Sequence, residues 1–174
     1  PSSHTLRMTG KVAEVNIIPN YIKDMENRFG KIGEGVKVVV DGANATGGVV
    51  GPELYKKLGC EVVELFSEPD GNFPNHHPNP SVEKTLDTLK EVVLKEHADV
   101  GIAYDGDSDR IGIIDTEGRF LTGDKLLLIY AQDLIEACKD KNIHPTVVSE
   151  VKCSQVLFDT IDKLGGHSVM CKTG

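Results

Sequence analysis

The stretch that most constrains the fold is the acidic run 105–110, Asp-Gly-Asp-Ser-Asp-Arg, in which three aspartates alternate with other residues. Apolar residues flank this run on both sides, at 100–104 and at 111–114. Short apolar runs bounded by turn residues are typical of buried strands. The pattern therefore predicts two strands that are joined by a tight acidic loop.

Three carboxylates in one short loop suit a divalent cation. Outside a helix, the side chains of Asp105, Asp107 and Asp109 can turn to one side and share a hard cation. Mg²⁺ prefers about six oxygen ligands and usually leaves some positions to water or to a phosphate. Without a cation the three negative charges repel one another. We therefore expect Asp105, Asp107 and Asp109 to be metal ligands.

Two other interpretations of the acidic run compete with this one. An EF-hand loop needs Gly at its sixth position and Glu at its twelfth, and Arg110 and Thr116 stand there, so this interpretation is excluded. A solvated acidic turn stays open, because acidic turns are common. The spacer Gly106, the adjoining Arg110 and the apolar flanks favour the metal loop over it.

At this point the sequence resembles a known family. The run 105–110 is similar to the metal-binding loop of the α-D-phosphohexomutases, the phosphoglucomutase/phosphomannomutase group, whose usual form has Gly where this chain has Ser108. The resemblance implies that the three aspartates bind Mg²⁺, which also touches a phosphoserine. It implies a catalytic contact for Arg110, which would help to hold that phosphoserine.

A glycine-rich segment, 41–48, follows the apolar strand expected at 36–40. A strand, a glycine-rich turn and a helix are typical of phosphate-binding loops, but this segment fits neither of the common nucleotide-binding motifs. A tight connection between a strand and a helix is the simpler interpretation. The family carries a similar Asp-Gly-Ala-Asn-Gly-type loop at this position, and the resemblance implies no chemical role for Asp41 or Asn44.

The proline-rich segment 68–80 resembles the family's Asp-Gly-x-Phe-Pro-x-His-x-Pro-x-Pro run. Its prolines exclude regular structure. Adjacent residues in an extended chain point to opposite sides, which disfavours His76 and His77 as two ligands of one metal. The resemblance implies that this segment shapes the loop beside the metal site.

Lys152 is expected where a strand ends and a helix begins, a suitable place for an ammonium group to meet a phosphate. From the residues alone, a solvated surface lysine is the more common outcome. The resemblance implies a substrate contact for Lys152, because the family has a substrate-binding lysine in a similar Val-Lys-Cys-type turn. The segment 171–174, Cys-Lys-Thr-Gly, is similar to the opening of the family's Lys-Thr-Gly-His loop.

Apolar periodicity and turn residues predict alternating strands and helices along the chain. The pattern is typical of a three-layer α/β/α domain with a mainly parallel sheet. An incomplete second α/β unit follows, and its two strands are too few to be stable alone. The expected elements are an extended piece at 12–18, strands at 36–40, 61–65, 100–104, 111–115, 120–121, 146–149 and 168–171, and helices at 19–29, 52–58, 82–97, 124–139 and 154–164.

The resemblance also implies a division into parts. Residues 1–30 would be a lead-in segment with a linker helix, residues 31–118 a unit like the family's second domain, and residues 119–174 part of its third domain. The family's phosphoserine loop, Thr-Ala-Ser-His-Asn-Pro-like, has no counterpart here, since Ser3-His4 lacks the following Asn-Pro.

The implied function is Mg²⁺-dependent intramolecular phosphoryl transfer on hexose phosphates, with this chain as a fragment that is inactive alone. Its partners would be a hexose phosphate and the remaining domains of the parent enzyme. The alternative from another class is a stand-alone Mg²⁺-binding module. A phosphatase of the DxD type, with Asp105 as nucleophile and Asp107 as acid, is disfavoured by Asp109 and Arg110 beside them.

Charge and composition exclude several other classes. The formal net charge of −8 disfavours nucleic acid and anionic membrane as main partners. No apolar run approaches a membrane span, and the segment 1–10 does not resemble a signal peptide. The four cysteines lack zinc-site spacing, so we expect reduced thiols and a cytoplasmic protein.

Overall fold

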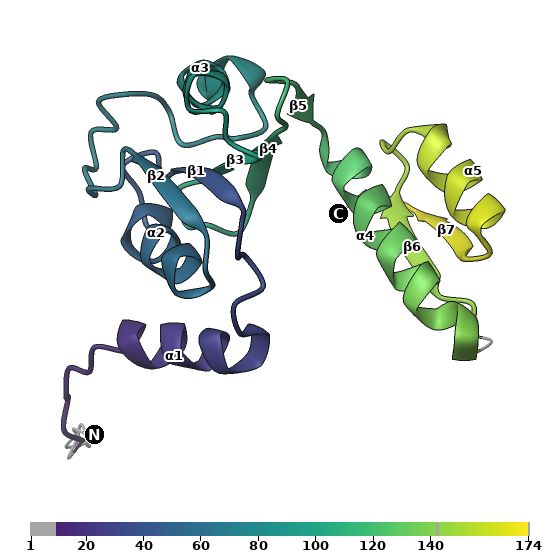
Figure 1. Ribbon diagram of the computed structural model, residues 1–174, viewed down its shortest axis with the longest axis horizontal. Coiled ribbons are helices and arrows are strands. Elements are labelled where there is room, and N and C mark those ends of the chain that lie inside the picture. Colours follow the sequence, from purple (N-terminus) through teal and green to yellow (C-terminus); the bar gives the residue numbers. More distant parts are fainter. Residues whose placement is uncertain (1–9, 142, 174) are drawn as a thin grey trace, which may run out of the picture.

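The computed structural model describes residues 10–141 and 143–173, and it consists of two α/β units that follow one another along the chain (Figure 1). The expectations for residues 1–9 and Gly174 lie outside the described residues. The first unit contains α1 (Ile18–Phe29), β1 (Lys37–Asp41), α2 (Gly47–Lys57), β2 (Glu61–Leu65), η1 (Glu83–Leu86), α3 (Asp87–Glu96), β3 (Val100–Tyr104), β4 (Ile111–Ile114) and β5 (Phe120–Leu121). The second contains α4 (Gly123–Cys138), η2 (Lys139–Lys141), β6 (Thr146–Glu150), α5 (Gln155–Leu164) and β7 (His167–Cys171).

The first unit is built on one five-stranded sheet with the order β2-β1-β3-β4-β5. Strands β2, β1 and β3 are parallel, and β4 and β5 continue the sheet as an antiparallel meander. The α/β fold class with a mostly parallel central sheet is thus confirmed, and β4 and β5 form a hairpin that ends at Leu121. Residues 105–110 connect β3 to β4 at the carboxyl end of β3, an end where open α/β sheets commonly bind ligands.

Helices cover both faces of this sheet (Figure 1). On one face, Leu89 and Val93 of α3 are fully buried against Val39 of β1 and Ala103 of β3. Since neighbouring strand residues point to opposite faces, Val40 lies on the other side, where it approaches α2 near Gly51. Helix α1 packs outside α2 and adds a further layer.

The second unit has a sheet of two parallel strands, β6 and β7, as expected. Helices α4 and α5 enclose a small apolar core around Ile135, Leu157 and Ile161. Helix α5 begins with a side-chain cap, because the hydroxyl of Ser154 accepts a hydrogen bond from the Val156 amide. Its end is set by Gly165, which adopts the left-handed conformation at φ 93°.

One local expectation was wrong. Helix α2 begins at Gly47 instead of Pro52, which lies inside the helix. The early start needs residues without a side chain, since a Cβ on Gly48 would lie 2.4 Å from the Ser67 carbonyl oxygen. Residues 10–17 lie outside helices and strands, and α1 begins at Ile18 with Ile17 at its N-cap.

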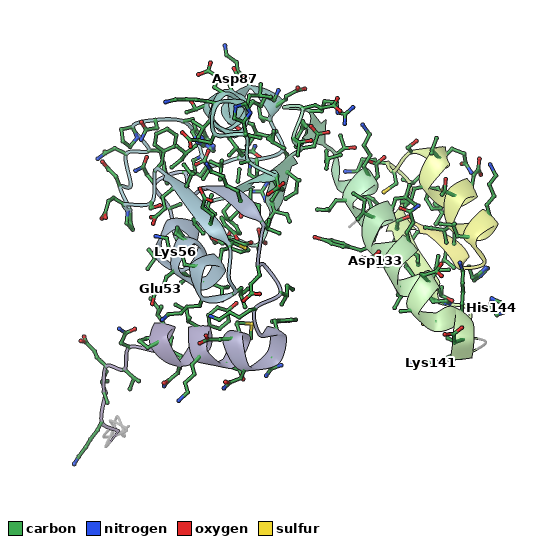
Figure 2. All side chains as sticks on the ribbon, viewed as in Figure 1. Glu53, Lys56, Asp87, Asp133, Lys141 and His144 are labelled. Carbon is green, nitrogen blue, oxygen red and sulfur yellow. The ribbon has the colours of Figure 1, made fainter. Side chains whose placement is uncertain are left out.

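Charged side chains occupy the outer faces of the helices, as Figure 2 shows for Glu53, Lys56, Asp87 and Asp133. In the part of the chain that the structure describes, no helix combines the length and the apolar character that a membrane span requires.

Candidate metal centre

The acidic loop is a tight reversal between two paired strands. Tyr104 of β3 lies opposite Ile111 of β4 in the antiparallel register. Within the loop, the Asp105 amide donates to the Arg110 carbonyl at 3.2 Å, and the Ser108 amide donates to the Asp105 carbonyl at 3.2 Å. The turn is completed by Ser108 in the left-handed conformation, at φ 64°. The two strands and these hydrogen bonds therefore fix where the loop side chains begin.

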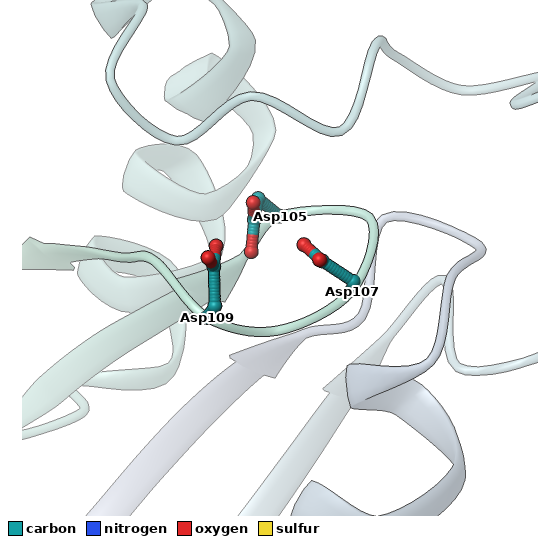
Figure 3. Close-up of side chains that lie close together, drawn as sticks. All are labelled: Asp105, Asp107 and Asp109. Atoms are coloured by element: carbon teal, nitrogen blue, oxygen red, sulfur yellow. The ribbon is translucent and has the colours of Figure 1, made fainter.

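The loop brings its three aspartates together (Figure 3). Asp105, Asp107 and Asp109 each have one carboxylate oxygen that lies within 4.8 Å of the corresponding oxygens of the other two. Asp105 is buried, and the other two are exposed. Carboxylate oxygens on one side of a loop, with open space beside them, are the donors that Mg²⁺ prefers, since this ion keeps several water or phosphate ligands. The donor set fits a magnesium ion.

Arg110 is bound to the buried member of the triad. Its backbone amide donates to Oδ1 of Asp105 at 3.0 Å, and its Nε donates to Oδ2 at 2.9 Å. The same Nε lies 3.6 Å from Oδ1 of Asp109. The Arg110 side chain is 56% exposed although Asp105 is only 1% exposed, so the guanidinium is anchored at its base and open to solvent beyond it.

Different neighbours shift the pKa values of Asp105 and Asp109 in opposite directions. Burial acts to raise the pKa of Asp105, but the backbone amide and the guanidinium of Arg110 outweigh burial and lower it. Hydrogen bonding to Asp105, together with the negative charges of Asp107 and Asp105, raises the pKa of Asp109. Arg110 thus favours the ionised form of Asp105, and the neighbouring carboxylates favour the protonated form of Asp109.

The glycine-rich and proline-rich segments are tied together beside this loop, and sequence reasoning gave no role to the residues that tie them. Asn44 donates from Nδ2 to the Glu68 carbonyl at 2.8 Å and accepts from Nδ2 of Asn75 at 2.7 Å. Pro78 lies next to Gly106, since a Cβ on Gly106 would be 3.8 Å from its ring. The proline-rich segment thus forms one wall of the acidic loop.

Asp41 and His76 form a buried pair within the same junction. The Asp41 carboxylate is fully buried and accepts from the Ala43 amide at 2.8 Å and from Nε2 of His76 at 3.0 Å. The other ring nitrogen of His76 lies 3.0 Å from the His77 carbonyl oxygen. The hydrogen bond to Asp41 raises the pKa of His76, although burial opposes it. Both ring nitrogens face acceptors, so the geometry suits an imidazolium.

Lys152 lies away from the triad, in the second unit, between β6 and α5. Its side chain is 67% exposed, and Nζ is 3.3 Å from a carboxylate oxygen of Glu150. It lines a hollow of about 520 Å³ with Asp124 and Cys153. Arg110 lines another hollow, of about 330 Å³, with Pro80 and Phe120. Both hollows include Thr122 and Gly123, at the start of α4, so they adjoin one another.

Known protein families match nearly all of the chain. Residues 19–118 match the model described as phosphoglucomutase/phosphomannomutase, alpha/beta/alpha domain II, and residues 122–174 match that of domain III. A phosphomannomutase/phosphoglucomutase from Pseudomonas putida is 41% identical over 165 residues, which are 95% of this chain and 35% of that relative. The chain therefore spans about a third of the length of the curated relatives it matches.

Solved structures give the same result. A phosphoglucomutase/phosphomannomutase family protein from Burkholderia thailandensis superposes with a TM-score of 0.82 at 33% identity, covering 93% of this chain and 34% of that protein. An N-acetylphosphoglucosamine mutase from Aspergillus fumigatus, solved with GlcNAc-6P and magnesium, shares the fold with a TM-score of 0.66 at 21% identity, covering 88% of this chain and 34% of that protein.

Proposed function

Because this chain belongs to the phosphoglucomutase/phosphomannomutase family, we propose that it supplies the Mg²⁺-binding loop and part of the sugar-phosphate site of a phosphohexomutase. The reaction of such an enzyme is an isomerisation by phosphoryl transfer between two positions of a hexose phosphate. This chain spans about a third of the length of the relatives that carry out the whole reaction.

The observation that carries this proposal is the convergence of three carboxylates in one loop (Figure 3). Asp105, Asp107 and Asp109 would hold the metal. A bound magnesium ion supplies positive charge that offsets the negative charge of a phosphoryl group during transfer. Because Asp107 and Asp109 are exposed, a phosphate oxygen could also reach a metal ion that these residues would hold.

Arg110 would stabilise the same phosphoryl group from beside the metal. In the described part of the chain, its ion pairs to Asp105 and Asp109 run through Nε. The outer nitrogens of the guanidinium can then face an anion in the hollow that Arg110 lines. Asp105 fixes the base of this side chain, so the charge is held in place before a phosphate arrives.

Lys152 would bind the sugar phosphate from the second unit. Its contact with Glu150 is exposed and therefore weak, and a phosphate can displace it at little cost. The hollows of Arg110 and Lys152 share Thr122 and Gly123, which favours one continuous site across the start of α4.

The division of the chain into two domains between residues 118 and 119, with a lead-in segment before residue 31, stays a prediction.

Relatives named as acting on mannose and glucose phosphates support a hexose phosphate as substrate. The remaining domains of the parent enzyme would supply the phosphoserine, so the chain alone contributes charge and binding surface. The stand-alone Mg²⁺-binding module, from a different class, shares the metal loop and differs in having no catalytic partner domains.

Calorimetric titration with Mg²⁺ tests the proposal. We expect one Mg²⁺ per chain, and we expect Asp107→Asn to weaken binding at least about tenfold, since it removes one of three charged ligands. Asp107 is exposed, so this change leaves the buried Asp105–Arg110 contact intact. Asp140→Asn, an equal charge change on η2, is the control and should bind as the wild type does. Wild-type chain that binds no Mg²⁺, or equal binding by all three proteins, would refute the proposal.

A further inference from the structure

Thr46 lies just before α2 and reaches across to the acidic loop. Its hydroxyl oxygen is 3.0 Å from the Gly106 carbonyl oxygen and 2.9 Å from the Ser108 hydroxyl oxygen. A carbonyl can only accept, so Thr46 donates its one proton to Gly106. The Ser108 hydroxyl must then donate to Thr46. Both hydrogen bonds have a fixed direction, and together they connect two segments that are distant in sequence.

The Thr46 hydroxyl does not stabilise its own helix. A threonine at the N-cap typically accepts a hydrogen bond from an amide of the first helical turn. Thr46 occupies the N-cap of α2 but has helical dihedral angles, φ −64° and ψ −30°, and its side chain makes no capping bond. Removing this hydroxyl should therefore affect the acidic loop and leave α2 intact.

Ser108 needs support from outside the loop. Its φ of 64° lies in the left-handed region, which is unfavourable for a residue with a Cβ. Ser108 stands between Asp107 and Asp109, so its backbone conformation sets the direction in which Asp109 leaves the turn. Relaxation of Ser108 to negative φ would carry Asp109 away from Asp105.

We propose that Thr46 and Ser108 are positioning residues, a pair of hydroxyl groups that holds the acidic loop in its ligand-binding conformation. The hydrogen bond from Ser108 to Thr46 secures the strained residue, and the bond from Thr46 to Gly106 secures the start of the same turn. The inference rests on the proposed function for the identity of the metal. The hydrogen bonds between Thr46 and the loop are also present in the metal-free chain, so their effect on the loop can be measured without metal.

A double-mutant cycle in the whole chain tests the coupling, with Mg²⁺ affinity as the first measurement. Thr46→Val keeps the shape of the side chain and removes its hydroxyl, and we expect about fivefold weaker binding. Ser108→Gly loses the anchor and the strain together, so we expect affinity within about twofold of wild type. Adding Thr46→Val to Ser108→Gly should then cost clearly less than Thr46→Val costs alone, because only the hydrogen bond to the Gly106 carbonyl is still lost.

Two controls separate positioning from a general effect of mutation. Thr46→Ser retains the hydroxyl and should bind Mg²⁺ as the wild type does. Thr160→Val removes a threonine hydroxyl from α5, in the other unit, and should have no effect. If Thr46→Val weakens binding equally in the wild-type and Ser108→Gly backgrounds, or in neither, the inference is wrong.

Amide hydrogen exchange in the metal-free chain distinguishes failure of this inference from failure of the proposed function. The Arg110 amide, which donates to Asp105, reports the loop conformation directly. We expect faster exchange in Thr46→Val, and a smaller increase when Thr46→Val is added to Ser108→Gly. If the wild type binds no Mg²⁺, the proposed function fails, and the exchange rates alone test whether Thr46 and Ser108 position the loop. Unchanged exchange in Thr46→Val would overturn this positioning role.

Discussion

At the scale of single residues, the site depends on negative charges that lie close together and on the hydrogen-bond donors that offset their repulsion. Asp105 is buried because Arg110 satisfies both of its carboxylate oxygens. Among the described residues, Asp109 has no such partner at close range, and its nearest cationic contact is 3.6 Å away. The two aspartates therefore respond differently to pH.

Mg²⁺ affinity should fall as the pH is lowered. Carboxylate ligands must be deprotonated to bind metal. The raised pKa of Asp109 means that its proton is taken up before that of an ordinary aspartate, whose pKa is about 3.9. Calorimetric titrations between about pH 7 and pH 4 should show this loss beginning above the ordinary value. Affinity that is constant until the ordinary value is reached would contradict the assignment of Asp109 as a ligand.

The backbone conformation of Ser108 explains why the similar loop of the family usually has glycine at this place. The turn requires a positive φ there, which glycine adopts freely and serine does not. The sequence displays the departure, but neither composition nor periodicity shows that Thr46, far away in the chain, faces Ser108. Only the folded backbone brings the two hydroxyl groups together.

At the scale of elements, the junction between the glycine-rich and proline-rich segments forms the wall of the metal loop. The proline-rich segment has no regular structure, so its shape depends on side-chain contacts such as Asp41–His76 and Asn44–Asn75. An unpaired carboxylate at the buried position of Asp41 would be unfavourable. His76 therefore acts as a structural tie between two elements.

Replacing His76 should destabilise the fold in a pH-dependent way. The pKa of His76 is raised in the folded state, chiefly by the hydrogen bond to Asp41. The stability it contributes is fully present below the unfolded pKa, about 6.5, and is lost as the pH rises through the folded pKa. His76→Gln should lower the free energy of unfolding by about 2 kcal/mol near pH 6, and by less at higher pH.

Urea denaturation at several pH values measures this difference. His77→Gln is the matched control, because His77 is the exposed neighbour of His76 and its side chain makes no ion pair with Asp41. Equal destabilisation by the two variants would show that the Asp41–His76 contact contributes nothing specific.

The elements themselves were largely predictable from sequence. The strands flanking the acidic loop followed from short apolar runs, because local pattern and burial agree there. The start of α2 was not predictable. Two glycines begin this helix because Tyr104 and Ser67 lie too close to leave room for a side chain, and only the folded structure shows these contacts. The roles of Asp41, Asn44 and His76 were also hidden, since polar contacts between irregular segments leave no periodic signal.

At the scale of the whole molecule, the chain matches only part of the length of its relatives. It spans about a third of its relatives' length, and its second unit carries exposed apolar residues such as Val148 of β6, 58% exposed, and Val156 of α5, 63% exposed. Apolar surface of this kind suits contact with further protein. The proposed reaction would need a phosphoserine, which the resemblance assigns to another domain of such an enzyme.

The 174-residue chain alone should therefore show no mutase activity. The physical reason is that metal and arginine can stabilise charge on a phosphoryl group but cannot replace the group that donates and accepts it. The assay follows interconversion of the 1-phosphates and 6-phosphates of glucose and mannose in the presence of Mg²⁺. Turnover above background by the purified chain, absent from the Asp107→Asn variant, would contradict the expectation.

The central claim is that the three aspartates bind one metal ion, and crystallography with Mn²⁺ in place of Mg²⁺ tests it most directly. The account predicts one anomalous difference peak within about 2.5 Å of a carboxylate oxygen of Asp105, Asp107 and Asp109. A peak bound by other residues, or none at millimolar Mn²⁺ in a well-ordered loop, would contradict the claim.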